Sequence, residues 1–212
     1  MSNQLRLNNI SLGYPGHRII TAMSDVYNNG LYLIRGANGC GKSTLLAALA
    51  GLHPIDSGQL EWNGKALKPD QLYFRRLMAH VADKPAFYPQ LQGRQLLDFV
   101  ASARGNSQKQ RQRGEQIIDH LGAIDYRGHR LEEMSLGTMK KFFLAAALMG
   151  QPSLLLLDEP FSALDQAARL ALAHELQQIA DSTIILLAEH SDLISGQPVD
   201  LARWRATPLN AD

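Results

Sequence analysis

A glycine-rich turn carries the clearest chemistry in this sequence. The pattern G-x-x-x-x-G-K-[S/T] runs from Gly36 to Ser43, between a strand-like run at 31–35 and a helix-like run at 45–50. Glycines allow positive φ and lack a Cβ, so such a turn can aim successive backbone N–H groups at an anion. The helix that follows adds the positive end of its dipole. The turn predicts a phosphate-binding site made of Gly36, Ala37, Asn38, Gly39, Cys40, Gly41, Lys42, Ser43 and Thr44.

Three side chains of this turn have predicted roles of their own. Lys42 would place an ammonium between the β- and γ-phosphates of a nucleotide, and the Ser43 hydroxyl would be an oxygen ligand for Mg²⁺. Thr44 would contact the α-phosphate or cap the helix. Cys40 occupies a variable position and is interpreted as a small filler. The alternative, a turn that merely joins a strand to a helix, is less favoured because the motif has its required strand-loop-helix context.

Two adjacent carboxylates form a second group of candidate residues. Asp158 and Glu159 follow the apolar run 154–157, at the edge of a predicted parallel sheet where ligands collect. Asp158 could hold Mg²⁺, and Glu159 could accept a proton from a water that attacks the γ-phosphate. His190 ends the next predicted strand and is expected near the same phosphate. A polar turn after a strand would explain the acidic pair alone, but not its combination with a phosphate loop.

The order of the predicted elements indicates an α/β fold. The core is expected to have three layers with a mainly parallel sheet, an N-terminal antiparallel β subdomain and an inserted helical subdomain. We expect the core and β subdomain at 1–84 and 151–212, and the helical subdomain at 85–150, in a single domain. Within the helical subdomain, 103–114 is polar and is predicted to be a surface loop. Strands are predicted at 5–12, 18–22, 31–35, 59–62, 77–82, 153–158, 183–188 and 201–205, and the main core helices at 42–50 and 166–180.

Composition is that of an ordinary globular protein. Of the 212 residues 45% are hydrophobic and 19% are charged, and the net charge of +1 gives no field that would attract nucleic acid. The basic stretch Lys109 to Arg113 is expected to be a solvated helix face. The single cysteine is consistent with a reducing cytosol. The first residues do not resemble a signal peptide, and the longest apolar runs fall short of the roughly 20 residues that span a bilayer.

These motifs resemble the nucleotide-binding subunit of ATP-binding cassette (ABC) transporters over almost the whole chain. The glycine-rich turn matches the Walker A motif of that family, 154–159 its Walker B motif, 162–165 its D-loop and His190 its switch histidine. The resemblance implies that ATP and Mg²⁺ bind here, and that Tyr14 stacks on adenine. A tyrosine packed on the surface of a turn is the alternative for Tyr14.

The family signature L-S-G-G-Q falls on Met134-Ser135-Leu136-Gly137-Thr138, which keeps the serine and the second glycine. The resemblance implies that Ser135 and Gly137 touch the γ-phosphate held by a second copy of the chain. Leu136 adds a side chain where backbone normally approaches closely. A serine that caps an ordinary helix is the alternative for Ser135.

The family's Q-loop glutamine is also missing. The aligned segment 81–87 has Asp83 or Lys84 in that place. Asp83 could still be an oxygen ligand for Mg²⁺, whereas Lys84 could not.

The resemblance implies an ATP-hydrolysing subunit that forms a head-to-tail dimer with a second copy and powers a separate transmembrane permease. It would lie on the cytoplasmic face of the inner membrane. The compact length is similar to small bacterial cassettes such as the heme-exporter subunit of cytochrome c maturation. The alternatives are a soluble ABC ATPase that acts on nucleic acid or ribosomes, and an unrelated kinase or GTPase. No nucleic-acid partner is expected, given the charge balance.

Overall fold

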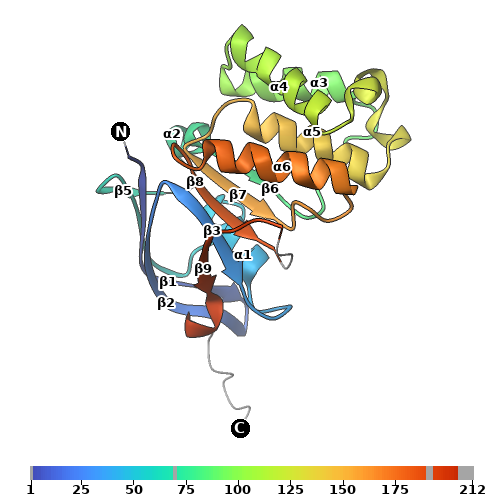
Figure 1. The fold of residues 1–212 in the computed structure, drawn as a ribbon. Helices are drawn as coiled ribbons and strands as arrows, with labels where there is room; N and C mark the ends of the chain where they lie inside the picture. The colour runs from blue at the N-terminus through green and yellow to red at the C-terminus, as the bar shows by residue number, and fades with distance from the viewer. Residues whose placement is uncertain (1, 69–70, 190–192, 205–212) are drawn as a thin grey trace.

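Two β-sheets and a set of helices make up the chain (Figure 1). The computed structural model describes residues 2–68, 71–189 and 193–204. The antiparallel sheet has the order β2-β1-β4-β5, with β1 at Gln4–Tyr14, β2 at His17–Asn28, β4 at Ser57–Trp62 and β5 at Lys65–Leu67. The second sheet is parallel and has the order β6-β7-β8-β3-β9, with β6 at Met78–Val81, β7 at Leu154–Asp158, β8 at Ile184–Ala188, β3 at Gly30–Arg35 and β9 at Gln197–Asp200.

The parallel sheet is the middle layer of three. Alternate residues of β7 point to opposite faces: Leu155 and Leu157 pack in a core with the helices α5 and α6, whereas Leu154 and Leu156 pack in a core with α1 and the antiparallel sheet. Every residue of β7 and β8 is buried, as expected for strands covered on both faces. The predicted three-layer α/β core, antiparallel subdomain and helical insertion are confirmed.

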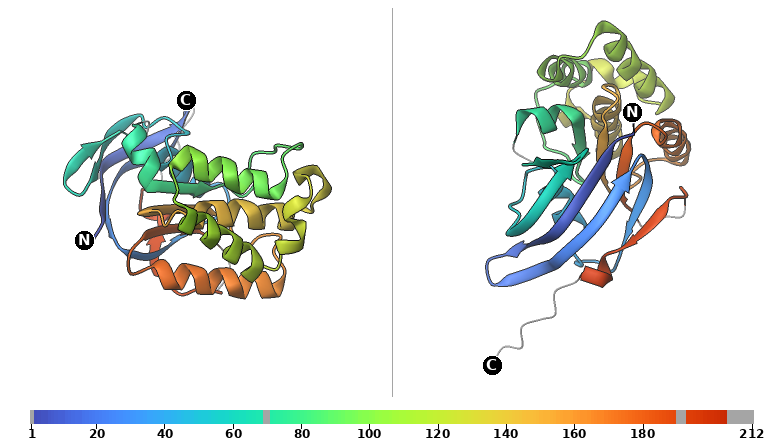
Figure 2. Two further views of the ribbon diagram at one scale, coloured as in Figure 1. Left: turned by 90° about the horizontal axis from the view of Figure 1, so that it is seen from above. Right: turned by 90° about the vertical axis from the view of Figure 1, so that its left-hand side faces the viewer.

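The helices form the outer layers. Three helices lie outside the insertion: α1 at Lys42–Leu49, α2 at Leu72–Leu77 and α6 at Gln166–Ile179. The helices of the insertion are α3 at Gly93–Arg104, α4 at Gln108–His120 and α5 at Leu136–Leu148. Short 3₁₀ turns occupy Ile124–Gly128, Leu131–Glu133 and Leu201–Trp204. The two further views separate the helical layer from the antiparallel strands (Figure 2). The predicted subdomain boundaries at 85 and 150 stay a prediction.

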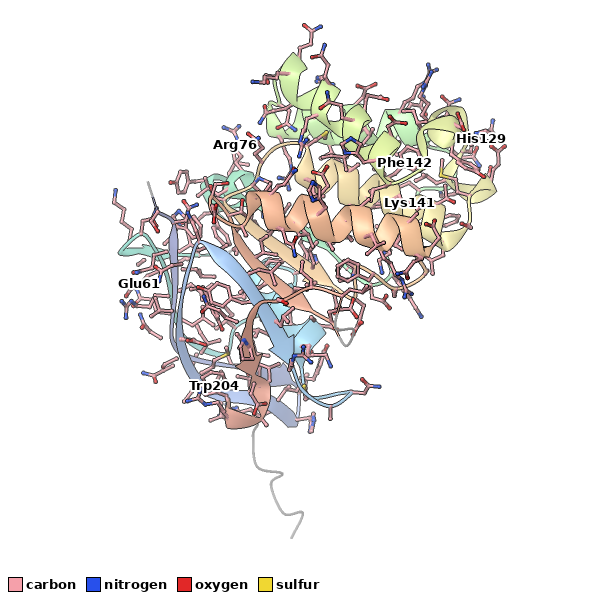
Figure 3. All side chains as sticks on the ribbon, in the orientation of Figure 1. Glu61, Arg76, His129, Lys141, Phe142 and Trp204 are labelled. Atoms are coloured by element: carbon pink, nitrogen blue, oxygen red, sulfur yellow. The ribbon has the colours of Figure 1, made fainter. Side chains whose placement is uncertain are left out.

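Close packing joins α3 to α5 inside the insertion. A Cβ on Gly93 would lie 2.5 Å from the ring of Phe142, so only a glycine lets the start of α3 approach that ring. Phe142 is labelled in Figure 3, on the α5 ribbon.

The prediction of a surface loop at 103–114 is wrong for most of that segment. Helix α4 begins at Gln108, and Ser107 caps it: the Gln110 N–H donates to Ser107 Oγ at 3.3 Å, and Ser107 N–H donates to the Gln110 side chain at 2.8 Å. Gly114, interpreted as a loop residue, lies buried within α4. Its lack of a Cβ lets the helix pack closely against Met149, since an added Cβ would be only 3.1 Å from the Met149 sulfur. Capping and packing therefore override the polar composition.

The predicted strand at 201–205 is also wrong. The last strand is β9, whose Gln197 to Asp200 pair in parallel with Tyr32 to Arg35 of β3. The chain then turns into the 3₁₀ segment at Leu201–Trp204, because the Asp200 carboxylate accepts the Ala202 N–H at 2.9 Å. Residue 205 lies outside the described residues. None of the described helices is both long and apolar enough to cross a bilayer.

The central strand should be the most sensitive to loss of volume. Replacing Leu156, fully buried in β7, by alanine is expected to lower the free energy of unfolding by about 3 kcal/mol, because a cavity opens between two packed layers. The control is Leu170→Ala on α6, where the side chain is 55% exposed and the expected change is within about 0.5 kcal/mol. Urea denaturation of both variants measures the difference, and equal losses would contradict the layer assignment.

Candidate functional site

A cavity of about 450 Å³ lies where the glycine-rich turn meets the first β-hairpin. Its volume falls in the range of small-molecule sites, roughly 300–1,000 Å³. Elements distant in sequence contribute to it: the turn before α1, the β1–β2 hairpin and the end of β7. The lining residues are Tyr14, His17, Ile19, Asn38, Gly39, Gly41, Lys42, Ser43, Thr44 and Glu159.

The glycine-rich turn has the backbone conformation that the motif predicts. Gly41 has φ 103° and precedes the first residue of α1, and Gly39 has φ 76°. A Cβ on Gly41 would overlap the Cγ2 atom of Ile19. A Cβ on Gly36 would lie 2.5 Å from the buried Cys40 sulfur, so Cys40 fills the inside of the turn. At Gly36 and Gly41, therefore, the close packing of the turn leaves no room for a Cβ.

The Lys42 side chain is buried and reaches back to the first residues of the turn. Its ammonium donates to the carbonyls of Gly36 at 3.0 Å and Ala37 at 3.4 Å. The first turn of α1 carries no acidic residue, so no carboxylate there opposes the positive field of the helix start. A cation, a helix start and the hydroxyls of Ser43 and Thr44 therefore face one cavity, a donor set that fits a polyphosphate.

The acidic pair lies at the carboxyl end of β7. Asp158 is buried, and Glu159 lines the cavity. Glu159 has φ 46°, and its N–H donates to the Ala188 carbonyl on the neighbouring strand at 2.8 Å. His80 on β6 is close enough to Asp158 to feel its charge: burial lowers the pKa of His80, the Asp158 carboxylate opposes that shift, and the pKa stays below its ordinary value.

Asp83 follows β6 and is engaged by protein groups. Its Oδ1 accepts hydrogen bonds from Lys140 at 3.2 Å and from the Ser162 hydroxyl at 2.7 Å. Burial raises the pKa of Asp83, but these hydrogen bonds and the charges of Lys140 and Lys84 outweigh it and hold that pKa below its ordinary value. Asp83 is not among the residues that line the cavity. Its role as a metal ligand stays a prediction.

Magnesium has candidate ligands in Ser43 and Asp158. Within the described part of the chain, no three His, Cys, Asp or Glu side chains cluster in a way that could hold a metal ion alone. Mg²⁺ usually keeps waters and is held by one or two carboxylates together with substrate phosphates. A hydroxyl and one carboxylate beside a phosphate cradle therefore fit that ion without a cage of protein ligands.

The signature residues lie at the start of α5. Ser135 is the N-cap, and its hydroxyl accepts the Thr138 N–H at 3.1 Å. Gly137 packs against the backbone of Ala163, where a Cβ would meet the Ala163 carbonyl. Neither residue lines the cavity of its own chain. The capping role is therefore observed, and the predicted contact with a second copy stays a prediction.

Tyr14 stands at the rim of the cavity with 54% of its surface exposed. Its ring meets the ring of His53 edge-on at 4.9 Å, and His53 hydrogen-bonds the Gly13 carbonyl at 2.8 Å. An exposed ring held from one side suits the stacking role predicted for it. His17 and Ile19 also line the cavity and were not predicted from the sequence, although the turn at Tyr14-Pro15-Gly16 signals the hairpin that pairs Tyr14 with His17. His190 lies outside the described residues.

Comparison with known proteins shows which family the chain belongs to. Residues 22–162, about two thirds of the chain, match the family model described as ABC transporter. The chain belongs to the ABC transporter family. That range includes the glycine-rich turn, the signature segment and the acidic pair.

Individual members of the ABC transporter family resemble much of the chain. The cytochrome c biogenesis ATP-binding export protein CcmA of Albidiferax ferrireducens is 27% identical over 90% of the chain and 92% of its own length. The CcmA protein of Aromatoleum aromaticum is 32% identical, over 75% of each. The ABC transporter ATP-binding protein YhaQ of Bacillus subtilis is 25% identical over 88% of the chain. The chain spans only 62% of the length of YhaQ and of its B. subtilis relative YxlF.

A solved ABC transporter ATP-binding subunit has the same fold. It matches with a TM-score of 0.80 and 27% identity, over 88% of the chain and 79% of the solved chain. A further match, an ABC transporter ATP-binding protein from Pyrococcus furiosus, has a TM-score of 0.78 at 20% identity and supports the fold alone.

The cradle predicts a specific pair of substitutions. Gly41→Ala is expected to weaken binding of a fluorescent ATP analogue roughly tenfold or more, because the new Cβ overlaps Ile19 and strains the backbone. Adding Ile19→Ala removes the overlapping Cγ2 atom and should recover part of the loss. Ile19→Ala alone is the matched control. Equal ATP-analogue affinities for Gly41→Ala alone and for Gly41→Ala combined with Ile19→Ala would show that the Ile19 contact does not shape the cradle.

Proposed function

We propose that this chain binds and hydrolyses ATP and powers a separate transmembrane permease. One observation carries the proposal: the phosphate loop and Glu159 line one cavity, although 115 or more residues of sequence separate them. A phosphate cradle alone supports binding. A carboxylate on the same cavity adds a group that can accept the proton of an attacking water.

Each predicted residue has a place in this reaction. Lys42 and the backbone of the turn hold the β- and γ-phosphates, and Tyr14 stacks on the adenine. Ser43 and Asp158 are the candidate ligands of Mg²⁺, which neutralises charge that develops on the phosphates. Glu159 is the proposed general base. His190 keeps its proposed role at the γ-phosphate, and Asp83 remains a candidate metal ligand.

A second copy of the chain is proposed to complete the site. Ser135 and Gly137 belong to a helix start whose first-turn N–H groups could face the γ-phosphate held by the other copy. Because these residues do not line the cavity of their own chain, the proposal requires a head-to-tail dimer with two shared sites. Leu136, 47% exposed at this helix start, would lie in that interface.

The proposed setting is the cytoplasmic face of the inner membrane, beside a permease that spans it. Two CcmA relatives are named ATP-binding export proteins, and one of them matches the chain over 92% of its own length. These likenesses support an export-type cassette similar to the heme exporter of cytochrome c maturation. The net charge of +1 offers no support for the alternative of a nucleic-acid partner.

Replacement of the proposed base tests the reaction. Glu159→Gln is expected to lower the ATPase rate by about 10²-fold or more while ATP still binds, because the amide cannot accept the proton. The variant should then elute as an ATP-dependent dimer on size-exclusion chromatography. Glu115→Gln, on the exposed face of α4, is the control. An unchanged ATPase rate in Glu159→Gln would remove Glu159 from its role.

Affinity purification from detergent-solubilised membranes tests the partner. A tagged chain is expected to retain a multi-spanning membrane protein in stoichiometric amount. Retention of nucleic acid or ribosomes instead would favour the soluble alternative. The ATPase rate of the purified complex, compared with the chain alone, measures whether the partner is coupled to hydrolysis.

A further inference from the structure

A buried lysine lies behind the proposed catalytic carboxylate. The Lys140 side chain, on the second turn of α5, is 0% exposed. Burying an ammonium costs folding free energy unless it is paired and hydrogen-bonded. The hydrogen-bond partners of Lys140 therefore show which groups it fixes in place. Lys140 does not line the cavity and therefore acts through other groups.

The ammonium of Lys140 has three protons and three acceptors. It donates to the Glu159 backbone carbonyl at 2.6 Å, to the Ser162 hydroxyl at 2.5 Å and to Asp83 Oδ1 at 3.2 Å. The Ser162 hydroxyl in turn donates to the same Asp83 oxygen at 2.7 Å. These three partners come from the segment after β6 and from the turn after β7.

The contact with Glu159 fixes an unusual backbone. Glu159 has φ 46°, in the left-handed region that a residue with a side chain adopts only when its surroundings hold it there. Its N–H is bonded to Ala188, and its carbonyl accepts both the Ser162 N–H at 3.0 Å and the Lys140 ammonium. Both peptide groups that flank the Glu159 Cα are therefore anchored, and the side chain from that Cα lines the cavity.

Neighbouring contacts join the same turn to the start of α5. Gly137 lies against the Ala163 carbonyl, and Lys141 donates to the Asp165 carboxylate at 2.7 Å. Lys141 is labelled in Figure 3, on the same helix. Both contacts are made further along the turn, at Ala163 and Asp165, whereas Lys140 bonds the Glu159 carbonyl itself.

We propose that Lys140 is a positioning residue for Glu159: it holds the Glu159 carbonyl so that the carboxylate faces the phosphate cradle, and Asp83 supplies the charge that lets the ammonium remain buried. The inference rests on the proposed function, since it assumes that Glu159 is the base. It assigns Asp83 an electrostatic role toward Lys140. Other residues line the cavity proposed to bind ATP, so replacing Lys140 should lower kcat more than it weakens the affinity for ATP.

Lys140→Met tests the positioning role, because methionine has a similar length and no donor. Its kcat is expected to fall by about 10²-fold with KM for ATP within about twofold, as for a displaced catalytic group. Hydrogen exchange of the Ser162 amide, which shares the Glu159 carbonyl, should become faster without nucleotide. Lys141→Met, the adjacent buried lysine that pairs with Asp165, is the control and should keep kcat close to that of the unchanged protein.

A double-variant cycle separates positioning from stability. Lys140→Met is expected to lower the Tm mainly when Asp83 is intact, because it leaves that carboxylate without its cation. In the Asp83→Asn background, Lys140→Met should change the Tm little but should still lower kcat by about 10²-fold. Recovery of kcat together with Tm in that background would overturn the inference and leave Lys140 a purely structural residue.

Glu159→Gln measured in parallel keeps the two proposals apart. If Glu159→Gln abolishes hydrolysis and Lys140→Met leaves kcat and Ser162 exchange unchanged, the positioning role fails and the proposed function stands. If Glu159→Gln hydrolyses ATP at the unchanged rate, the proposed function itself fails.

Discussion

Burial of β7 on both faces is the constraint on which the rest of the structure depends. Its leucines alternate between the helical layer and the layer of α1 and the antiparallel sheet, so neither face can turn toward water. The parallel register with β8, and of β8 with β3, then aligns the carboxyl ends of these strands at one edge. That edge carries Asp158 and Glu159 from β7 and the glycine-rich turn from β3. The site is a consequence of the way in which apolar strands are stacked.

Charged side chains that cross between layers are paired where they are buried. Lys140 connects α5 to Asp83 and to the turn after β7, and Glu175 of α6 accepts hydrogen bonds from Arg113 and His120 of α4. Glu175 is almost completely buried, so its two partners compensate the lost hydration. These pairs connect the helical insertion to the core at defined points, whereas apolar packing alone would allow more than one alignment. The lysine behind Glu159 thereby links the edge of the parallel sheet to the helix that begins at Ser135.

The cavity is lined by only some of the residues that match motifs of the ABC transporter family. The chain supplies a cradle, a candidate base and an exposed aromatic ring to that cavity, while Ser135 and Gly137 lie outside it. The altered signature carries Leu136, and the segment aligned with the Q-loop has Asp83 or Lys84 in place of the glutamine. Leu136 is exposed at the helix start, and Asp83 is bound to Lys140 and Ser162. The Lys140–Asp83 pair therefore connects the segment after β6 to the helix that begins at the altered signature.

The sequence by itself determined the phosphate loop, the apolar strand that ends in an acidic pair, the fold class and the resemblance to the family. Those features depend on residues close together in the chain: glycines that need positive φ, a lysine at a helix start, and runs of leucine too apolar for a surface. The sequence did not predict the first half of helix α4, from Gln108 to Gly114, because its polar residues suggest a loop. The capping hydrogen bonds at Ser107 and the packing of Gly114 against Met149 are visible only in the structure. It also placed the last strand too late, because β9 is selected by pairing with β3. Only the tertiary structure decided which distant residues share the cavity and that the Lys140 ammonium bonds the Glu159 carbonyl. Contacts between residues far apart in the sequence depend on how the helices and strands pack, which local sequence patterns do not specify.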